Sequence, residues 1–201
     1  MKRNILFIVI TFISLNAFSQ SEIAKYKANQ IINDKSYNLE LLSNYSGKND
    51  KIYLDVDGTT NKAFLMLKKE QRDNIKLMIN KFYEWSRKAD SAKIDAEKTL
   101  GFIDCSGGFE YGSKYYFDYD VNVEFIFYSF KLSDGSFIRE MALKIPKMIA
   151  SDNEYIDIDK RMIWIKEVDM KKFEIAISEE TISKYRISEE IKNKNVDDLL
   201  K

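Results

Sequence analysis

The chain contains no histidine among its 201 residues. Without imidazole, Ser-His-Asp and Cys-His catalysis, zinc sites that use histidine and haem held by a proximal histidine are excluded. The chemistry that remains open uses carboxylates, hydroxyls, lysine or tyrosine, or metal ions with oxygen ligands. Since no complete catalytic set of these groups is recognisable, we predict no enzyme activity, no catalytic residue, no cofactor and no metal site.

Cysteine, proline and glycine are also scarce. Cys105 is the only cysteine, so no intramolecular disulfide can form and stability must come from the core. We expect Cys105 to be buried as a small apolar side chain rather than to act as a nucleophile, because it has no histidine partner. One proline, seven glycines and 45% apolar residues exclude collagen-like, mucin-like and intrinsically disordered classes.

An excess of positive charge is missing as well. The full chain has 32 basic and 32 acidic side chains. Removing residues 1–19, which carry Lys2 and Arg3 and no acidic residue, leaves 30 basic against 32 acidic side chains. Phosphate binding needs a basic excess or a concentrated basic stripe, so we predict that nucleic acid is not a partner.

The first 19 residues have the pattern of a secretory signal peptide. Lys2 and Arg3 precede an apolar run over 5–13, and small residues at Ala17 and Ser19 predict cleavage after Ser19. The alternatives are a buried N-terminal helix or a retained membrane anchor, but the run is shorter than the roughly 20 residues that span a bilayer. We therefore expect an exported protein, periplasmic or extracellular, whose residues 20–201 form one α+β domain with no membrane span.

The segment 68–98 predicts one long amphipathic helix. Apolar residues recur there at spacings of three and four, at Ile75, Met78, Phe82, Trp85, Ala89, Ala92 and Ala96. We interpret this stripe as core packing, and the alternative is a helix that binds a partner. A second helix is expected from Asp169 as N-cap, with Met170, Phe173, Ile177 and Ile182 facing inward, followed by a charged tail over 188–201.

The other segments predict strands. The pattern favours a short helix over 21–33, a strand over 37–42 and a hairpin of 51–56 with 62–67. Apolar residues of one parity run from Tyr111 to Phe127, either as one long strand or, as we favour, as two strands with a turn at 118–122. Further strands are expected over 137–145, 155–158 and 162–168, with Pro146 ending the first of them and a hairpin around Asp159-Lys160 joining the other two.

Consecutive strands without intervening helices indicate an antiparallel sheet, because parallel strands need long crossovers. The predicted fold class is therefore α+β. It comprises an antiparallel sheet of about five to seven strands, with the long amphipathic helix and a C-terminal helix packed on one face. The other face is expected to be partly open.

The string Ile52-Tyr53-Leu54-Asp55-Val56-Asp57-Gly58-Thr59-Thr60 resembles the first motif of the haloacid dehalogenase superfamily. The resemblance implies an exported Mg²⁺-dependent phosphohydrolase, with Asp55 as nucleophile and Asp57 as general acid and base. It also implies a parallel doubly wound sheet, which the order of predicted elements does not provide. We therefore interpret Asp55 and Asp57 as part of a loop between two antiparallel strands.

Three Asp-x-Asp pairs occur, at Asp55 and Asp57, Asp118 and Asp120, and Asp157 and Asp159. No complete calcium loop surrounds them, so we expect solvated loop carboxylates. The segment Cys105-Ser106-Gly107-Gly108 is expected to be a connector between helix and sheet. Aromatic residues are concentrated over 109–130, where they favour the core but are also compatible with a groove for a peptide or a sugar.

These observations predict an exported, non-catalytic binding or interaction domain, with an unknown protein, peptide or sugar as its partner. The first alternative is the phosphohydrolase that uses Asp55 and Asp57. The second is an inhibitor or immunity-type protein that binds its partner through the long helix.

Overall fold

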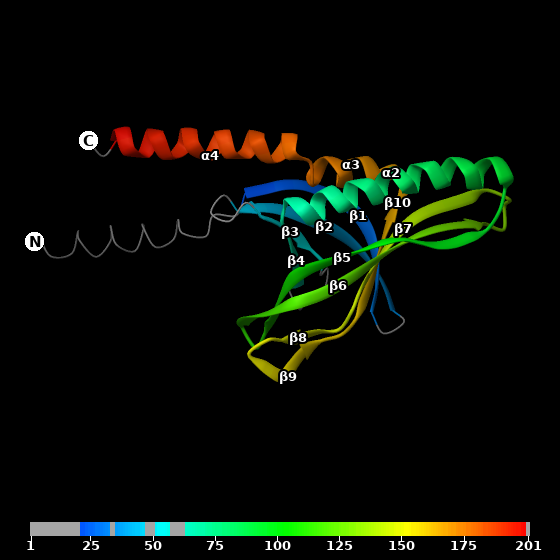
Figure 1. The fold of residues 1–201 in the computed structure, drawn as a ribbon, viewed down its shortest axis with the longest axis horizontal. Coiled ribbons are helices and arrows are strands. Elements are labelled where there is room, and N and C mark those ends of the chain that lie inside the picture. Colours follow the sequence, from blue (N-terminus) through cyan, green and yellow to red (C-terminus); the bar gives the residue numbers. More distant parts are fainter. Residues whose placement is uncertain (1–20, 33–34, 47–50, 57–62, 200–201) are drawn as a thin grey trace, which may run out of the picture.

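The computed structural model describes residues 21–32, 35–46, 51–56 and 63–199 (Figure 1). Residues 1–19, on which the predicted signal peptide falls, and Asp57 lie outside this part of the chain. The described elements, in chain order, are β1 (Ser21–Ile32), β2 (Lys35–Ser46), β3 (Lys51–Asp55), β4 (Ala63–Leu67), α2 (Lys69–Ala92), β5 (Ala96–Tyr111), β6 (Lys114–Lys131), β7 (Phe137–Ile145), β8 (Met148–Ala150), β9 (Asn153–Ile158), β10 (Arg161–Lys166), α3 (Glu167–Ala176) and α4 (Glu179–Leu199).

The predicted antiparallel α+β fold is confirmed, and the main sheet is closed on itself. Its strands follow the order β1-β10-β7-β6-β5-β4-β3-β2, with β2 returning to β1, and every neighbouring pair is antiparallel. β8 and β9 form a separate two-stranded sheet. Closure gives every strand in the ring a neighbour on both sides, so the sheet has no end strand of the kind that an open sheet exposes.

The segment that closes the ring was expected to be helical, and that prediction is wrong. β1 pairs with β2 over most of its length and with β10 at Asn29, Gln30 and Ile31. The β2 ladder pairs one edge of β1 and the β10 ladder pairs part of the other, and this strand pairing outweighs a short stretch of local helical preference.

The prediction of one long helix after β4 is confirmed, although α2 ends at Ala92 instead of near Lys98. Lys93 adopts a left-handed conformation with φ of 53° and donates its backbone N–H to the carbonyl of Ala89, which ends the helix. Ala96 then begins β5, so the expected helical end at Thr99 to Gly101 lies in a strand.

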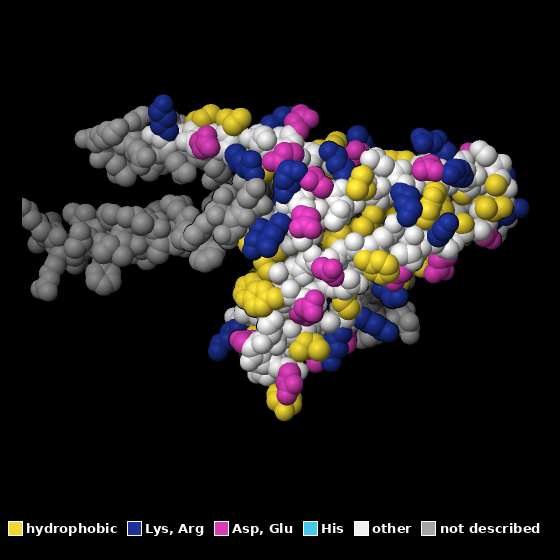
Figure 2. Space-filling view, viewed as in Figure 1, with side chains coloured by type: hydrophobic (Ala, Val, Ile, Leu, Met, Phe, Trp, Pro, Cys, Tyr) yellow, Lys and Arg dark blue, Asp and Glu magenta, His cyan; other side chains and the backbone are white. Residues whose placement is uncertain are grey.

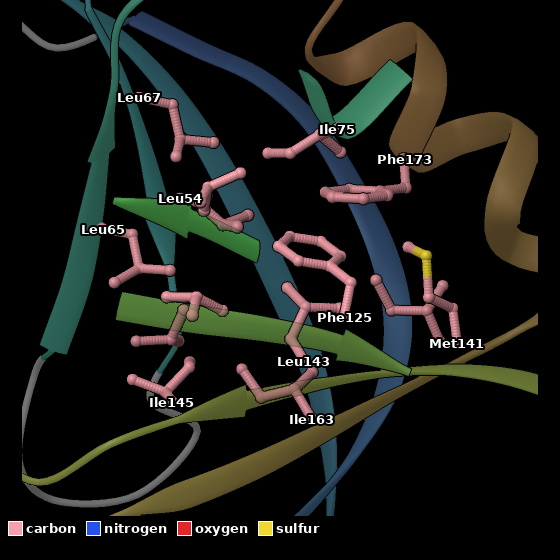
Figure 3. Packing of buried hydrophobic residues seen from close by; sticks show 14 of the residues in the cluster. Leu54, Leu65, Leu67, Ile75, Phe125, Met141, Leu143, Ile145, Ile163 and Phe173 are labelled. Carbon is pink, nitrogen blue, oxygen red and sulfur yellow. The ribbon is translucent and has the colours of Figure 1, made fainter. Parts of the chain in front are cut away.

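The apolar stripe of α2 packs into the core. Ile75 and Phe82 of the predicted stripe are buried, whereas Ala92 at the end of the helix is exposed. α2 and α3 lie on the same side of the barrel (Figure 1). Ile75 of α2 and Phe173 of α3 point toward Phe125 of β6 inside the barrel (Figure 3). Because this stripe is covered, it does not support the hypothesis that the long helix is a recognition face.

The hairpin predicted before α2 is confirmed by the register of β3 with β4, from Ile52 opposite Leu67 to Asp55 opposite Phe64. Pro146 follows the last residue of β7 as predicted. The strands on either side of Asp159-Lys160 are present, but they are not a hairpin: β9 pairs with β8, whereas β10 pairs with β7 and β1.

The C-terminal helix begins earlier than predicted. α3 starts at Glu167 with Lys166 at the N-cap, so Asp169 lies in the first turn, where its carboxylate accepts a hydrogen bond from Lys172 Nζ at 3.1 Å. Met170, Phe173, Ile177 and Ile182 are buried as predicted, but the expected single helix is two, because α3 ends with Ile177 at its C-cap and Ile182 lies in α4. None of the helices in the described part of the chain has the length and apolar character needed to cross a membrane.

Candidate functional site: an aromatic platform beside a polar hollow

A β-bulge in β6 turns three aromatic side chains toward the solvent. Cys105 of β5 is opposite Val121, whereas Gly107, two residues later, is opposite Asp118, so β6 contains one extra residue between these pairs. Tyr115, Phe117 and Tyr119 are 50%, 37% and 67% exposed, although the residues of the same parity beyond the bulge, from Val121 to Phe127, are buried. The predicted turn at 118–122 is therefore wrong, since β6 is one strand with a bulge.

These side chains belong to a larger aromatic cluster on the outer surface of the barrel. We define the aromatic platform as Tyr53 of β3, Phe64 of β4, and Tyr115, Phe117 and Tyr119 of β6. Phe64 is central, with ring centroids 5.4 Å from Tyr53, 6.1 Å from Tyr115 and 6.3 Å from Phe117. The rings of Phe117 and Tyr119 are parallel, with centroids 6.4 Å apart and an interplanar angle of 5°.

Tyr115, Phe117 and Tyr119 are exposed, whereas Tyr53 and Phe64 are half-buried beneath them in the cluster. Exposed apolar patches of this kind often mark a binding surface. Figure 2 shows hydrophobic side chains scattered among acidic and basic ones on the visible face of the molecule. The aromatic concentration that the sequence favours as core is thus divided between core and surface.

Contacts from the β8–β9 sheet hold the bulge in place. The Asp118 carboxylate accepts hydrogen bonds from the backbone N–H of Asp120 at 3.0 Å and of Ile149 at 2.9 Å. Ser151 donates its backbone N–H to the carbonyl of Phe117 at 2.8 Å, and its Oγ accepts from the backbone N–H of Tyr119 at 3.3 Å. The platform therefore lies on a backbone fixed by its neighbours.

A polar hollow of about 180 Å³ adjoins the platform. Its lining comes from four strands and the start of α2, and it shares Tyr119 with the platform. The residues that line this polar hollow are Lys51, Met66, Lys68, Gln71, Asp104, Cys105, Ser106 and Tyr119.

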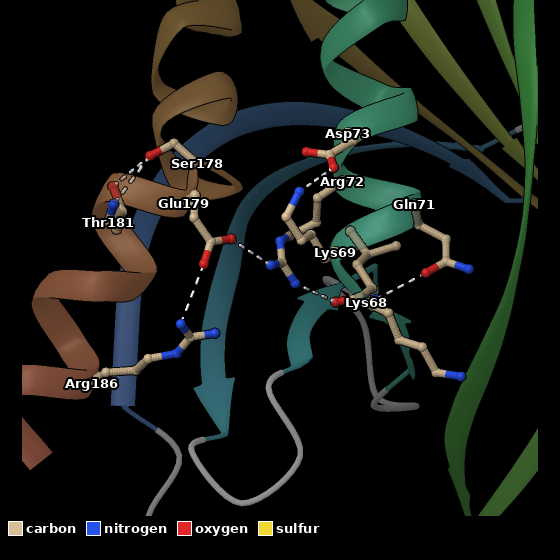
Figure 4. A network of polar contacts seen from close by, with 10 residues as sticks. Lys68, Lys69, Gln71, Arg72, Asp73, Ser178, Glu179, Thr181 and Arg186 are labelled. Atoms are coloured by element: carbon tan, nitrogen blue, oxygen red, sulfur yellow. Dashed lines mark hydrogen bonds and ion pairs between the residues drawn. The ribbon is translucent and has the colours of Figure 1, made fainter. Parts of the chain in front are cut away.

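Hydrogen bonds at the start of α2 fix one wall of the hollow. Gln71 Oε1 accepts from the backbone N–H of Lys68 at 3.1 Å, and Gln71 Nε2 donates to the Asp104 carbonyl at 2.9 Å. Figure 4 shows Lys68 and Gln71 extending from α2 toward the neighbouring strand. The Asp104 carboxylate accepts from Asn122 Nδ2 at 2.7 Å.

A buried arginine anchors the same end of α2. The Arg72 guanidinium donates from Nη1 to the Leu67 carbonyl at 3.2 Å and forms an ion pair from Nη2 to Glu179 Oε2 at 3.0 Å (Figure 4). Glu179 also pairs with Arg186 at 3.4 Å. The first turn of α2 is thus tied to β4 and to α4, which keeps the Lys68 and Gln71 side of the hollow in position.

Cys105 lies in the lining of the hollow and is buried, as predicted. Burial raises the pKa of its thiol to about 12, and the negative charges of Asp104 and Asp118 act in the same direction. The thiol stays protonated near neutral pH, which does not suit a nucleophile. The segment Cys105 to Gly108 lies within β5, so its prediction as a connector is wrong.

The residues of the dehalogenase-like string lie in a different setting from the one that the resemblance implies. β3 has β2 and β4 as antiparallel neighbours on its two sides, whereas that family has a parallel sheet. Asp55 is opposite Phe64 in this ladder. Among the residues that the structure describes, no group of three or more acidic or cysteine side chains is placed to hold a metal ion.

The prediction that the Asp-x-Asp pairs lie in loops is wrong for the first residue of each pair, since Asp55 lies in β3, Asp118 in β6 and Asp157 in β9. Asp118 holds the bulge, and Asp157 forms an ion pair with Lys147 at 2.8 Å.

The comparisons with known proteins do not identify a relative. No family model, no curated protein and no solved structure matches the chain.

The sequence did not single out the platform residues Tyr53 and Phe64 or the hollow residues Lys51, Lys68 and Asp104. They belong to different elements and meet only through the register of β3, β4 and β5 with the start of α2. One usable signal was the concentration of Tyr and Phe just before the acidic string at 118–120, where polar residues interrupt the apolar alternation.

Proposed function

We propose that the protein is exported and acts as a non-catalytic carbohydrate-binding domain through the aromatic platform. The observation that carries this proposal is the pair of exposed, parallel rings of Phe117 and Tyr119 beside a hollow lined by polar groups. A sugar ring has an apolar face of C–H groups and a rim of hydroxyls. Aromatic rings match the apolar C–H face, and hydrogen-bonding side chains match the hydroxyls of the rim.

A peptide ligand is less favoured by the closed sheet. Extended peptides commonly bind by adding a strand to a free sheet edge, where main-chain hydrogen bonds supply affinity. β3 and β4 each pair with a neighbour on both sides here, whereas β6 pairs with β5 alone over 114–118. The other edge of this part of β6 is partly occupied, because the Phe117 carbonyl accepts the backbone N–H of Ser151. A ligand that lies on the exposed rings is held by side chains, which suits a sugar better than an extended peptide.

A role without catalysis is supported by the chemistry of the residues present. The chain has no histidine, and burial keeps the Cys105 thiol protonated. Export is supported by the positively charged start, short apolar run and small residues of 1–19.

The binding proposal is tested with the chain from Gln20 onward on arrays of neutral, acidic and amino oligosaccharides and of peptides. Tyr119→Ala and Phe117→Ala should each reduce oligosaccharide binding by roughly 5-fold to 100-fold, which corresponds to about 1–3 kcal/mol of lost stacking. Tyr155→Ala is the matched control, because Tyr155 of β9 is 88% exposed and outside the platform. Binding only to peptides, or binding to sugars that neither platform variant weakens, would contradict the proposal.

Export is tested separately by the intact mass of the protein recovered from its native host. The mature chain should begin at Gln20 or within one or two residues of it. Full-length protein recovered from the cytoplasm would show that residues 1–19 do not direct export.

A further inference from the structure

We infer that the polar hollow is a subsite for one uncharged sugar residue, adjacent to the sugar that stacks on Tyr119. This inference rests on the proposed function, because it assumes that the aromatic platform binds a carbohydrate. It adds a position, a size and a charge preference for the ligand.

The hollow and the platform are continuous on the outer surface of β4, β5 and β6. In the ladder of β4 with β5, Phe64 is opposite Gly108 and Met66 is opposite Ser106, so the platform and the hollow occupy successive rows of one face. Tyr119 borders both. A chain of sugars stacked on Phe117 and Tyr119 therefore reaches the hollow with its next residue.

The size of the hollow limits what enters it. Pockets for drug-sized ligands are roughly 300–1,000 Å³. The hollow, at about 180 Å³, is smaller than these and suits a single ring. The remaining sugars of a longer chain would stay on the open platform.

The hydrogen-bonding groups of the hollow are of both kinds. Lys51 and Lys68 supply ammonium donors, the Asp104 carboxylate supplies an acceptor, and the Ser106 hydroxyl both donates and accepts. A sugar hydroxyl also donates and accepts, so it can satisfy either kind of group. The mixture thus matches a ring that carries several hydroxyls.

The same mixture disfavours charged sugars. Lys51, Lys68 and Asp104 line the hollow together, so a uronate carboxylate would meet Asp104 beside the two lysines, and an amino group would meet the lysines beside Asp104. Either charge therefore meets a like charge in the hollow. Repulsion between like charges is a common means of excluding a wrong ligand. An uncharged ring meets neither penalty.

The test uses calorimetric titration of the chain from Gln20 with defined hexasaccharides. The neutral probes are the hexamers of cellulose, starch, laminarin, mannan and chitin, and the charged probes are the hexamers of oligogalacturonate and chitosan. At least one neutral hexamer should bind about tenfold more tightly than either charged hexamer.

Two charge reversals in the hollow sharpen the test. Lys68→Glu and Asp104→Lys should each weaken the best neutral hexamer by about tenfold, and Asp104→Lys should strengthen oligogalacturonate binding. The matched controls are Lys76→Glu on the exposed face of α2 and Asp152→Lys in the turn between β8 and β9, which should leave these affinities unchanged.

The two proposals fail in different ways. If Tyr119→Ala abolishes hexamer binding but both hollow variants bind as the parent does, the subsite inference is overturned and the platform proposal stands. A parent protein that prefers oligogalacturonate or chitosan also overturns the uncharged subsite alone. If no hexamer binds and the arrays yield only peptides, both proposals are overturned.

Discussion

The ring of Phe64 occupies the space that a side chain on Gly108 would need. A Cβ placed on Gly108 would lie 2.5 Å from Cζ of Phe64 and 3.2 Å from Cδ1 of Phe117. Gly108 is opposite Phe64 on one side and Phe117 on the other, so the glycine allows the two rings to meet across β5. A glycine inside a strand often marks such a close approach.

Replacing this glycine should disturb the platform. Gly108→Ala places a methyl group against Phe64, and overpacking of this kind typically costs about 1–3 kcal/mol. We expect a lower free energy of unfolding in urea denaturation and weaker oligosaccharide binding, because the Phe64 ring must move.

Ser106→Ala is the control for stability, since it lies on the same face of β5 two residues away and adds no atoms. It should change stability by no more than about 0.5 kcal/mol. Parental stability and parental binding in Gly108→Ala would mean that the Phe64 ring yields without cost and that the close approach does not shape the platform.

The core role of α2 is tested at Phe82. Its ring is buried, and its centroid lies 5.5 Å from that of Phe127 and 5.9 Å from that of Tyr83. Phe82→Ala should destabilise the fold by about 3–5 kcal/mol, whereas Leu77→Ala, at a residue 66% exposed on the same helix, should change stability by no more than about 0.5 kcal/mol. Unchanged thermal stability of Phe82→Ala together with loss of a bound partner would instead make the helix an interface.

The sequence was sufficient to predict a helix or strand where a regular apolar pattern marks the buried face of the element. The stripe through Ile75, Met78 and Phe82 predicted α2, and the alternation around Met141 and Leu143 predicted β7. It failed for β1, which forms a hairpin with the adjacent β2 and pairs at three residues with β10, much later in the chain. The local preference for helix or strand is weak in β1, so its pairing within the closed sheet determines that it is a strand.

The bulge in β6 explains why the site was not recognisable. Tyr115, Phe117 and Tyr119 share a sequence parity with Val121 and Val123, so an uninterrupted strand would bury all of them. The one extra residue in β6 turns Tyr115, Phe117 and Tyr119 to the outer face of the barrel, although aromatic or apolar residues still alternate with polar ones in the sequence. The hollow could not be predicted either, because it requires the register of four strands and the position of the first turn of α2.

The protonated state of Cys105 predicts low reactivity. Because burial raises its pKa to about 12, the thiolate is a very small fraction of the native protein near neutral pH. Labelling by a thiol-disulfide reagent should therefore be much slower in the native protein than in urea, where the thiol has its ordinary pKa. Equal rates in the native and unfolded protein would mean that the thiol is neither buried nor shifted.

Glu140 predicts a pH-dependent contribution to stability. It is a buried residue of β7, and desolvation raises the pKa of its carboxyl group above the usual 4.5, partly opposed by the positive charge of Lys166. The folded state therefore holds this proton more tightly than the unfolded state does. The associated stability is present below pH 4.5 and is lost as the pH rises through the folded pKa.

Glu140→Gln, which cannot ionise, should accordingly be more stable than the parent near neutral pH, and the difference should vanish in acid. Melting temperatures of both proteins across a pH series provide the measurement. Glu154→Gln, at an exposed position of β9, is the control and should have little effect on stability. A stability difference between Glu140→Gln and the parent that is largest in acid would contradict the prediction, because desolvation destabilises only the ionised form of Glu140.

Asp118 predicts a link between the β8–β9 sheet and the orientation of the platform. Its carboxylate accepts backbone hydrogen bonds from Asp120 inside β6 and from Ile149 in β8, so one side chain holds both the bulge and the neighbouring sheet. A hydrogen bond to a charged group contributes about 1.5–3 kcal/mol. Asp118→Ala should therefore destabilise the fold by roughly that amount and speed amide hydrogen exchange at Ile149.

The same variant should also weaken oligosaccharide binding, because the bulge directs Phe117 and Tyr119 outward. Asp120→Ala is the control, since it keeps the backbone N–H that Asp118 binds, and it should change neither the exchange at Ile149 nor the binding. Parental exchange at Ile149 in Asp118→Ala would mean that the hydrogen bonds of Ser151 hold the two sheets together without the carboxylate.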